Sequence, residues 1–234
     1  ESVRTNSVAT RNCRLAAIRS FFKHLVRVDL PHADQYQRVL ALPAKRTKPT
    51  LSSYLEAEEV RAILEQPNRS TSLGSRDYAL LLFLYNTGAR VSEALAVRCA
   101  DLRLTHPCQV RLHGKGRKDR LCPLWRETAR VLQRLPAVRD AQPGGFIFVN
   151  RNGEPLTRDG VAYLLRKYVA AAVPSTPNLG HRRVTPHVLR HSCAVSLLQA
   201  GIDITVIRDY LGHASVATTS RYLTTNLQMK QAAL

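Results

Sequence analysis

The chain has 234 residues, 44% of them hydrophobic, which is enough to bury the core of one medium domain with a smaller unit beside it. Lysine and arginine number 35 against 17 aspartates and glutamates, so the net charge is +18 and a polyanionic partner, nucleic acid first, is expected. The composition argues against disorder. Because no apolar run approaches about 18 residues and no signal peptide opens the chain, we expect a cytoplasmic protein with no membrane association.

The five cysteines are scattered along the chain and include no CxxC pair. This spacing suggests neither a zinc site nor a redox site. We therefore expect reduced cysteines that pack in the interior of a cytosolic protein.

A basic amphipathic helix is predicted over residues 7–28, because apolar side chains recur there at helical spacing. Between them stand basic residues that we expect to contact DNA, among them Arg11, Arg14 and Arg19. A proline interrupts the pattern, and a second short helix is predicted over 33–42. The proline- and lysine-rich stretch 43–49 then indicates an interdomain linker.

The rest of the chain is predicted to be mainly helical. Helices are expected over 55–64, 76–85, 91–97, 125–135 and 158–172, with a helical C-terminal third after a proline-rich loop. The exception is 109–124, where two β-type runs flank a tip of glycine, lysine and arginine, a pattern typical of a hairpin. The fold class is therefore mainly α with a small β-hairpin or sheet.

Five short motifs follow one another in this part of the chain. They are Thr87-Gly-Ala-Arg90-Val-Ser-Glu93, Gly114-Lys115-Gly116, Thr185-Pro-His187-Val-Leu-Arg190-His191, Leu211-Gly-His213 and Thr218-Thr-Ser-Arg-Tyr222. Each motif is weak alone, but in this order and spacing the chain resembles the tyrosine recombinase/integrase family from about residue 50 to its end. Motif spacing is similar to that of Xer recombinases and of small phage or transposon integrases, and the tail from Thr218 to Lys230 resembles transposon and genomic-island integrases.

Arg90 and Arg190 are the expected clamp for a phosphate. Attack on a phosphodiester builds negative charge on its non-bridging oxygens, and a planar, permanently charged guanidinium can contact two of them. In a chain with 35 basic residues, a surface or salt-bridged arginine is the alternative for each. Glu93, one helical turn after Arg90, is expected either to hold that guanidinium in place or to be a solvated glutamate.

Lys115 lies between two glycines at the hairpin tip, where the backbone can approach DNA closely. The resemblance makes Lys115 the general acid that protonates the departing 5′-oxygen. A loop lysine that touches phosphate is the alternative. That simpler role is expected of the neighbouring basic residues Arg117, Lys118 and Arg120.

Two histidine motifs complete the candidate cationic groups. His187, at a predicted helix start, is the expected acid/base partner because imidazole titrates near working pH. His191 is expected to be a packing residue or to support the residues that contact the phosphate. A zinc pair is not expected, because the HExxH signature needs Glu where this chain has Val188. His213 is expected to donate to the scissile phosphate, with a simple helix-end histidine as the alternative.

Tyr222 is the expected nucleophile. A free phenol has a pKa near 10, so attack needs cationic neighbours and a base. Only Tyr222 follows the Leu-Gly-His motif at the distance that the family shows. Tyr163, Tyr168 and Tyr210 are expected to be ordinary core or surface residues.

The resemblance implies two domains around DNA. Residues 1–47 would be the C-terminal part of a helical, SAM-like core-binding domain plus the linker, and residues 48–234 the tyrosine recombinase catalytic domain. We expect that the natural protein extends before Glu1 and that the C-terminal segment that docks onto a neighbouring subunit is shortened at Leu234.

The same resemblance implies DNA recombination or integration, such as transposition of a mobile element, through a 3′-phosphotyrosine and a Holliday junction. The expected partners are double-stranded DNA at an inverted-repeat site, a second copy on that site and a homotetramer at synapsis, in a prokaryotic cytoplasm. No cofactor or metal is expected, because the protein–DNA bond conserves the phosphodiester energy. A type IB topoisomerase-like enzyme and a non-catalytic DNA-binding relative are the alternatives.

Overall fold

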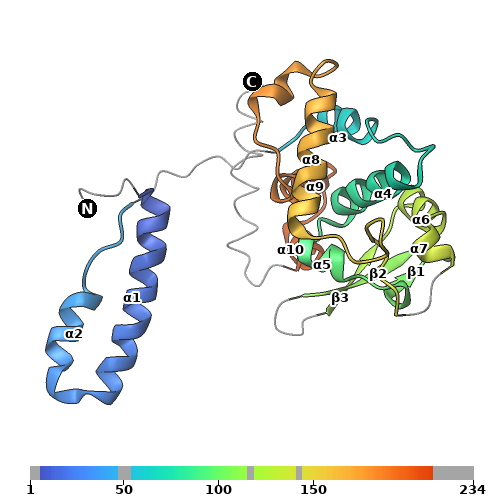
Figure 1. Ribbon diagram of the computed structural model, residues 1–234. Coiled ribbons are helices and arrows are strands. Elements are labelled where there is room, and N and C mark those ends of the chain that lie inside the picture. Colours follow the sequence, from blue (N-terminus) through green and yellow to red (C-terminus); the bar gives the residue numbers. More distant parts are fainter. Residues whose placement is uncertain (1–5, 47–53, 115–118, 141–143, 213–234) are drawn as a thin grey trace. The chain divides into compact units, whose positions relative to one another are not determined.

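The computed structural model describes residues 6–46, 54–114, 119–140 and 144–212 (Figure 1). The chain divides into two compact units, Glu1–Leu51 and Ser52–Leu234. None of the helices in the described ranges is both long and apolar enough to cross a bilayer. The assignment of residues 1–47 and 48–234 to a core-binding and a catalytic domain stays a prediction.

The smaller unit is a helical hairpin. Its elements are α1 (Val8–Val28), the 3₁₀ turn η1 (Leu30–His32) and α2 (Ala33–Leu40). Ser7 caps α1 by accepting the backbone N–H of Thr10, and the rings of Phe22 and Tyr36 pack 5.6 Å apart between the two helices. No residue of these three elements is buried, so the hairpin has no core of its own.

The larger unit is helix-rich with one small sheet. Its helices are α3 (Ala57–Leu64), α4 (Ser72–Thr87), α5 (Val91–Ala96), α6 (Arg126–Gln133), α7 (Pro136–Arg139), α8 (Arg158–Ala172), α9 (Pro186–Gln199) and α10 (Ile204–Leu211), with 3₁₀ turns η2 (Cys99–Asp101) and η3 (Pro177–His181). The expected helices are present within the described residues, and the part of the predicted helical C-terminal third after residue 212 lies outside them. The helix predicted over 76–85 is longer in the structure: Thr71 caps it, so it begins four residues earlier, at Ser72, and it ends two residues later, at Thr87.

Helix α4 is the centre of the larger unit. Ten of its last eleven residues, from Asp77 to Thr87, are buried, and only Tyr85 among them is half-exposed. Phe83 stacks edge-on against Phe148 with ring centroids 5.5 Å apart. Helices α3, α6 and α9 pack directly on α4, so both of its ends are held in fixed positions.

The sheet is antiparallel, in the order β1 (Leu102–Arg103), β2 (Gln109–His113) and β3 (Asp119–Pro123). Strands β2 and β3 form the expected hairpin, in register at Leu112 and Arg120. The two-residue β1 was not predicted. Val110, Leu112 and Cys122 are fully buried on the face toward the helices, which lie on one side of the sheet in Figure 1.

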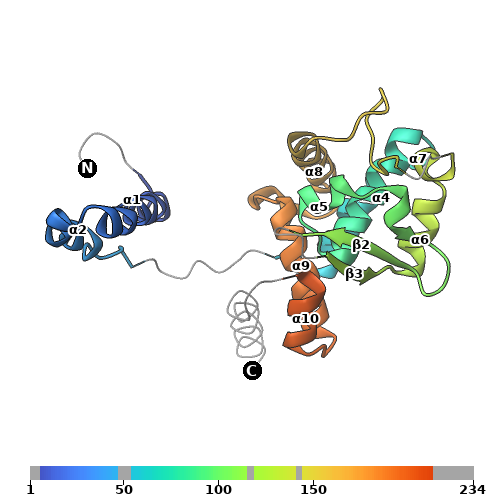
Figure 2. The ribbon, with the colours of Figure 1, turned by 90° about the horizontal axis from the view of Figure 1, so that it is seen from below.

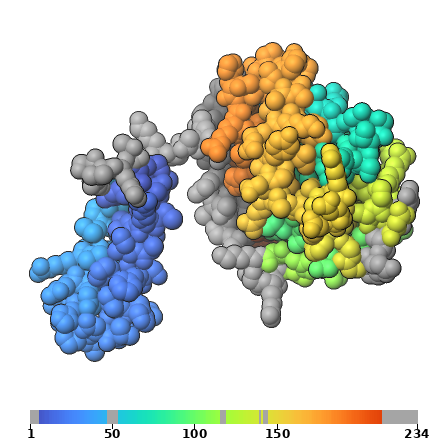
Figure 3. Space-filling view, in the orientation of Figure 1, coloured from blue at the N-terminus to red at the C-terminus, as the bar shows by residue number. Residues whose placement is uncertain are grey.

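Helices α9 and α10 lie side by side in Figure 2, with β3 next to α10. A small separate core of Cys193, Ala194, Ile207 and Leu211 joins the two helices. In Figure 3, α8 and the segment that precedes it spread across the visible face of the larger unit. The C-terminal ends of α4 and α10 thus belong to elements that are anchored from several sides.

Candidate active site

The first part of the site is the sharp turn between α4 and α5. Gly88 ends α4 with a φ of 55°, a left-handed conformation that favours glycine. A Cβ at Gly88 would lie 2.4 Å from Leu211 Cδ2 and 3.3 Å from Cys193 Sγ, so close packing also excludes a side chain. The turn places Arg90, the N-cap residue of α5, beside the end of α10.

Glu93 lies one helical turn after Arg90 and is only 4% exposed. Its carboxylate accepts hydrogen bonds from the Arg90 backbone N–H at 3.0 Å, from Arg90 Nη1 at 2.6 Å and from Arg120 Nη2 at 2.8 Å. Burial alone raises the pKa of this carboxyl group, but the hydrogen bonds from Arg120 and Arg90 outweigh it and lower the pKa to about 2. Glu93 is therefore a buried carboxylate that holds two guanidinium groups, not a solvated glutamate.

Arg190 comes from α9 and is 4% exposed. Its Nη1 donates to the carbonyl oxygen of Gly88 at 2.5 Å, and its Nη2 to that of Leu211 at 2.7 Å. These carbonyls stand at the C-terminal ends of α4 and α10, which carry partial negative charge. Arg190 thus ties together two helix ends that are far apart in sequence.

The end of α10 brings the two arginines to one place. Gly212 follows Leu211 with a φ of 66° and turns the chain away from the helix axis. Arg90 Nη2 lies 3.5 Å from the carbonyl oxygen of Gly212. The Arg90 side chain is 45% exposed, so its guanidinium is accessible to a ligand from solvent. Two guanidinium groups around one turn can contact an anion with several oxygens, such as a phosphate.

The two histidines of the third motif differ in environment. His187, in the first turn of α9, is exposed, and Thr185 caps that turn by accepting the backbone N–H of Val188. His191 is 3% exposed and packs against the Tyr54 ring, with ring centroids 6.2 Å apart. In the ranges that the structure describes, no three His, Cys, Asp or Glu side chains are grouped so that they could hold a metal ion.

Several predicted site residues lie outside the described residues. They are Lys115, Arg117, Lys118, His213 and Tyr222. Their neighbours in the chain are placed: Gly114 follows β2, and Gly212 directly precedes His213. The structure therefore fixes where the hairpin tip begins and where the segment after α10 begins.

His113, which directly precedes the predicted hairpin tip, was not selected from the sequence. It lies at the end of β2, where Nδ1 bonds Asp119 at 2.9 Å and Nε2 bonds Asp101 at 3.0 Å. The hydrogen bonds with Asp119 and then Asp101 raise the pKa of this imidazole, because protonation lets both nitrogens donate. His113 thereby joins both strands of the hairpin to η2, immediately before Gly114.

The described arginines that were expected to contact DNA differ in their exposure and in their hydrogen-bond partners. Arg120, expected at a phosphate, is 11% exposed and directs its guanidinium to Glu93 and to the end of α10. On α1, Arg14 is exposed, whereas Arg11 and Arg19 are half-buried and Arg19 Nη2 donates to the Leu42 carbonyl.

The other candidate tyrosines have structural environments. The Tyr210 hydroxyl donates to the Asn86 carbonyl at 2.6 Å, and burial raises the pKa of Tyr210 strongly. The Tyr168 hydroxyl donates to Asp77 at 2.7 Å, and burial again raises the pKa. Tyr163 is 60% exposed on α8. The hydroxyls of Tyr210 and Tyr168 are thus engaged with acceptors inside the fold.

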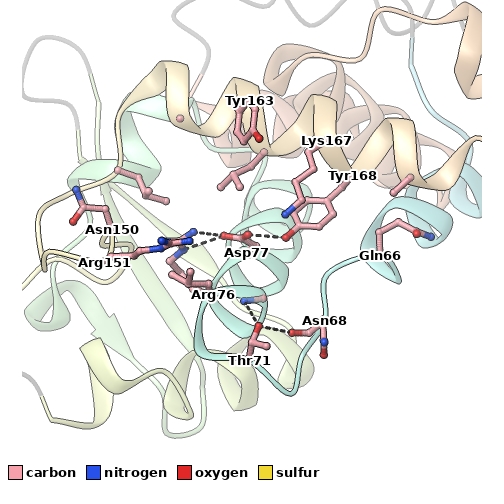
Figure 4. A pocket seen from close by; sticks show the side chains of 16 residues that line it. Gln66, Asn68, Thr71, Arg76, Asp77, Asn150, Arg151, Tyr163, Lys167 and Tyr168 are labelled. Atoms are coloured by element: carbon pink, nitrogen blue, oxygen red, sulfur yellow. Dashed lines mark hydrogen bonds and ion pairs between the residues drawn. The ribbon is translucent and has the colours of Figure 1, made fainter.

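A hollow of the larger unit lies at the opposite end of α4, between its first turns and α8 (Figure 4). It has a volume of about 670 Å³. Its buried carboxylate, Asp77, accepts hydrogen bonds from Arg76 and from the Tyr168 hydroxyl, which Figure 4 shows as one chain of contacts. The Asp77 carboxylate is thus hydrogen-bonded within the fold. The pocket is separate from the group formed by Arg90, Arg120 and Arg190, called here the arginine cluster.

Comparison with known proteins gives one consistent result. Residues 53–229 match the model of the phage integrase family. The protein y4rC of Sinorhizobium fredii, described as an integrase/recombinase, is 44% identical over 230 residues, which cover 97% of this chain and 69% of that protein. Tyrosine recombinase XerC of Myxococcus xanthus is 38% identical over 92% of this chain and 71% of its own length.

Solved structures show the same fold. XerA recombinase superposes with a TM-score of 0.63 and 27% identity, covering 84% of this chain and 71% of that one. The Tn1549 transposon integrase in complex with circular intermediate DNA gives a TM-score of 0.68 at 20% identity, covering 93% of this chain and 75% of that one. XerH bound to its palindromic difH substrate gives 0.67 at 22% identity, covering 99% and 72%.

Proposed function

The chain belongs to the phage integrase family of tyrosine recombinases, and we propose the route by which it acts as a site-specific DNA recombinase. The Tyr222 oxygen attacks the scissile phosphorus, a 3′-phosphotyrosine forms, and the 5′-oxygen of the next nucleotide leaves with a proton. The 5′-hydroxyl of a partner strand then attacks this ester, which releases Tyr222 and rejoins the DNA. Two such exchanges pass through a Holliday junction.

The observation that carries this proposal is the convergence of Arg90 and Arg190 on the turn at Leu211 and Gly212. Charge that develops on the non-bridging oxygens needs donors that are already in place, because reorientation would cost free energy during the reaction. Glu93 fixes Arg90, and carbonyls of two helix ends fix Arg190. Both cations therefore keep their positions before DNA binds.

The remaining groups are assigned by their places in the chain. Lys115, next to the placed Gly114, is the proposed general acid for the 5′-oxygen. His187, exposed at the start of α9, is the proposed acid/base partner, and His213, next to Gly212, the proposed donor to the phosphate. Lysine and histidine side chains can each carry a proton and a positive charge, which suits proton transfer and phosphate contact.

The proposed partner is double-stranded DNA, in keeping with the +18 charge and with DNA-bound recombinases among the structures of similar fold. We further propose an inverted-repeat site occupied by two copies, a tetramer at synapsis and a cytoplasmic location. Exposed arginines such as Arg14 would contribute to affinity through phosphate contacts. Arg117 and Lys118 are assigned the same role.

The test begins with the target site. Purified protein is incubated with sheared genomic DNA of its source, and DNA that stays attached to protein under denaturing conditions is sequenced. A duplex of the recovered sequence, nicked so that the short 5′-hydroxyl strand diffuses away after cleavage, then traps the covalent intermediate. Wild-type protein is expected to give an adduct, and Tyr222→Phe is expected to bind the duplex without one, because the ring stays and the nucleophilic oxygen is gone.

Tyr163→Phe is the matched control, since Tyr163 is an exposed tyrosine of α8 outside the arginine cluster. It should form the adduct at the wild-type level. An adduct that persists in Tyr222→Phe would contradict the proposed nucleophile. Relaxation of supercoiled DNA without exchange between two sites would instead favour a type IB topoisomerase-like activity. DNA binding with no adduct from wild-type protein or any variant would favour a non-catalytic relative.

A further inference from the structure

Arg120 occupies a position that a phosphate contact does not explain. It stands on β3, its side chain is 11% exposed, and its neighbour across the hairpin is the fully buried Leu112. We propose that Arg120 is a positioning residue, which holds the Arg90–Glu93 pair and the turn before His213 in one fixed arrangement. This inference rests on the proposed function, because it concerns the same site.

The first contact joins Arg120 to the phosphate clamp. Arg120 Nη2 donates to Glu93 Oε2 at 2.8 Å, while Arg90 Nη1 donates to Glu93 Oε1 at 2.6 Å. The two guanidinium groups therefore share one buried carboxylate through different oxygens. Without Arg120, Glu93 would lose one of its two charged partners in a buried place, where an unsatisfied carboxylate is strongly unfavourable. The orientation of Arg90 would then no longer be set by the β-sheet.

The second contact joins Arg120 to the end of α10. Arg120 Nε donates to the Tyr210 carbonyl at 3.0 Å. A Cβ at Gly212 would lie 2.9 Å from Arg120 Nη1 and 3.2 Å from its Cδ, so the arginine packs directly against the turn. Arg120 therefore packs on the turn that directly precedes His213 in the sequence.

Three arginines thus meet three successive carbonyls. Arg120 donates to Tyr210, Arg190 to Leu211 at 2.7 Å, and Arg90 approaches Gly212 at 3.5 Å. Like charges this close repel one another, and the arrangement is stable because a helix C-terminus and one buried carboxylate supply the compensating negative charge. Arg120 contacts both Glu93 of α5 and Tyr210 of α10. It therefore couples the carboxylate that holds Arg90 to the helix end that accepts a hydrogen bond from Arg190.

The contacts require arginine and not merely a positive charge. Nε and Nη2 lie on one edge of the guanidinium and point in parallel, toward the Tyr210 carbonyl and the Glu93 carboxylate respectively. The single ammonium of lysine lacks this planar pair of donors. Arg120→Lys is therefore expected to keep the charge and lose the coupling.

The experiment uses the full chain and the nicked trapping duplex. Arg120→Lys and Arg120→Gln are compared with wild type for the dissociation constant at several salt concentrations and for the single-turnover cleavage rate at saturating protein. Circular dichroism and thermal melts identify a temperature at which every variant is fully folded, and the rates are measured at that temperature. Arg111→Lys and Arg111→Gln are the matched controls, since Arg111 is an exposed arginine on β2 of the same hairpin.

Both Arg120 variants are expected to cleave about 10- to 100-fold more slowly, the size of effect that displacement of a catalytic group by about 1 Å produces. The log–log salt dependence of binding should stay at the wild-type slope. When Arg120→Lys is added to Glu93→Gln, the cleavage rate should fall by less than a further threefold, because the shared carboxylate through which Arg120 acts is already gone.

Three results would overturn the proposal. A salt slope reduced by about one unit in both variants would make Arg120 a phosphate contact. If the cleavage rate of the double variant falls by the product of the two single-variant losses, Arg120 acts independently of Glu93. Wild-type cleavage by fully folded Arg120→Gln would leave Arg120 with no role in the reaction. Failure of the proposed function itself would be distinct, because wild-type protein would then form no adduct.

Discussion

The helical hairpin and the larger unit are both rich in arginine, but they hold their arginines in opposite ways. No residue of α1 or α2 is buried, and Arg14 extends into solvent. In the larger unit, Arg190 is 4% exposed and bonded to two helix ends. An exposed arginine contributes a positive charge that any cation could replace. An enclosed arginine also fixes the positions of the groups to which it donates hydrogen bonds. Substitution by lysine should therefore be severe at the enclosed arginines of the larger unit and mild at exposed arginines such as Arg14.

The largest difference is expected for Arg190→Lys. Its two carbonyl acceptors need the separated donors of a guanidinium, and the loss of one preorganised donor typically lowers a rate by about 10²–10³-fold. Single-turnover cleavage on the nicked duplex measures this, with DNA binding expected to stay within about threefold. Arg166→Lys, an exposed arginine of α8, is the control and should cleave as wild type. Equal rates for the two variants would remove the distinction between enclosed and exposed arginines.

A second effect separates proton transfer from charge stabilisation. Lys115→Ala should slow cleavage by about 10²–10⁴-fold if Lys115 is the general acid. A substrate with sulfur in place of the bridging 5′-oxygen leaves without a proton, so it should restore much of this loss. The same substrate should do little for Arg90→Ala, whose defect is at the non-bridging oxygens. Equal rescue of both variants, or of neither, would contradict the assignment of Lys115.

The buried carboxylate gives a prediction for acid stability. The pKa of Glu93 is lowered to about 2, below that of an unfolded glutamate, so its ionised form stabilises the fold above about pH 4.5, and this contribution is lost as the pH falls toward 2. It amounts to about 3 kcal/mol. Urea unfolding at pH 5 and pH 3 should show a larger loss of stability in wild type than in Glu93→Gln. Parallel losses in both proteins would mean that Glu93 is not held as a carboxylate.

The smallest effect is expected in the hairpin. Arg14→Ala should weaken DNA binding a few-fold and reduce the log–log salt slope by about 0.9, as for one phosphate contact. Arg14→Lys should behave as wild type, since only charge is needed at an exposed position. Binding titrations between 50 and 200 mM salt are the measurement. Loss of cleavage at saturating Arg14→Ala, comparable with that of Arg190→Lys, would contradict the comparison.

Much of the fold follows from local sequence signals. The helix predicted over 158–172 has the observed bounds, and the predicted hairpin 109–124 contains both β2 and β3. The signals there are strong because apolar spacing and turn residues agree. Strand β1 was missed, since two residues are too few to show an alternation, and α4 was predicted too short because its capping threonine lies before a polar first turn.

For the site, the sequence indicated Arg90, Glu93 and Arg190 but not how they are held. The carbonyls that receive Arg190 lie about 20 and about 100 residues away, and no local pattern reports such contacts. The inward position of Arg120 had no clear signal in the sequence. Residues two apart in a strand share a face, and Arg120 shares one with the buried Cys122. The intervening Leu121 is apolar yet 59% exposed, so a hydrophobic alternation would have placed Arg120 on the solvent side.

The most direct test of the account is the identity of the residue that carries the DNA. The covalent complex trapped on the nicked duplex is digested with nuclease and trypsin, and the nucleotide-bearing peptide is sequenced by mass spectrometry. We expect a modified Tyr222, in the peptide that follows Arg221, and no nucleotide on Tyr210 or Tyr163. A nucleotide on any other residue would contradict the proposed nucleophile and with it the role of the arginine cluster.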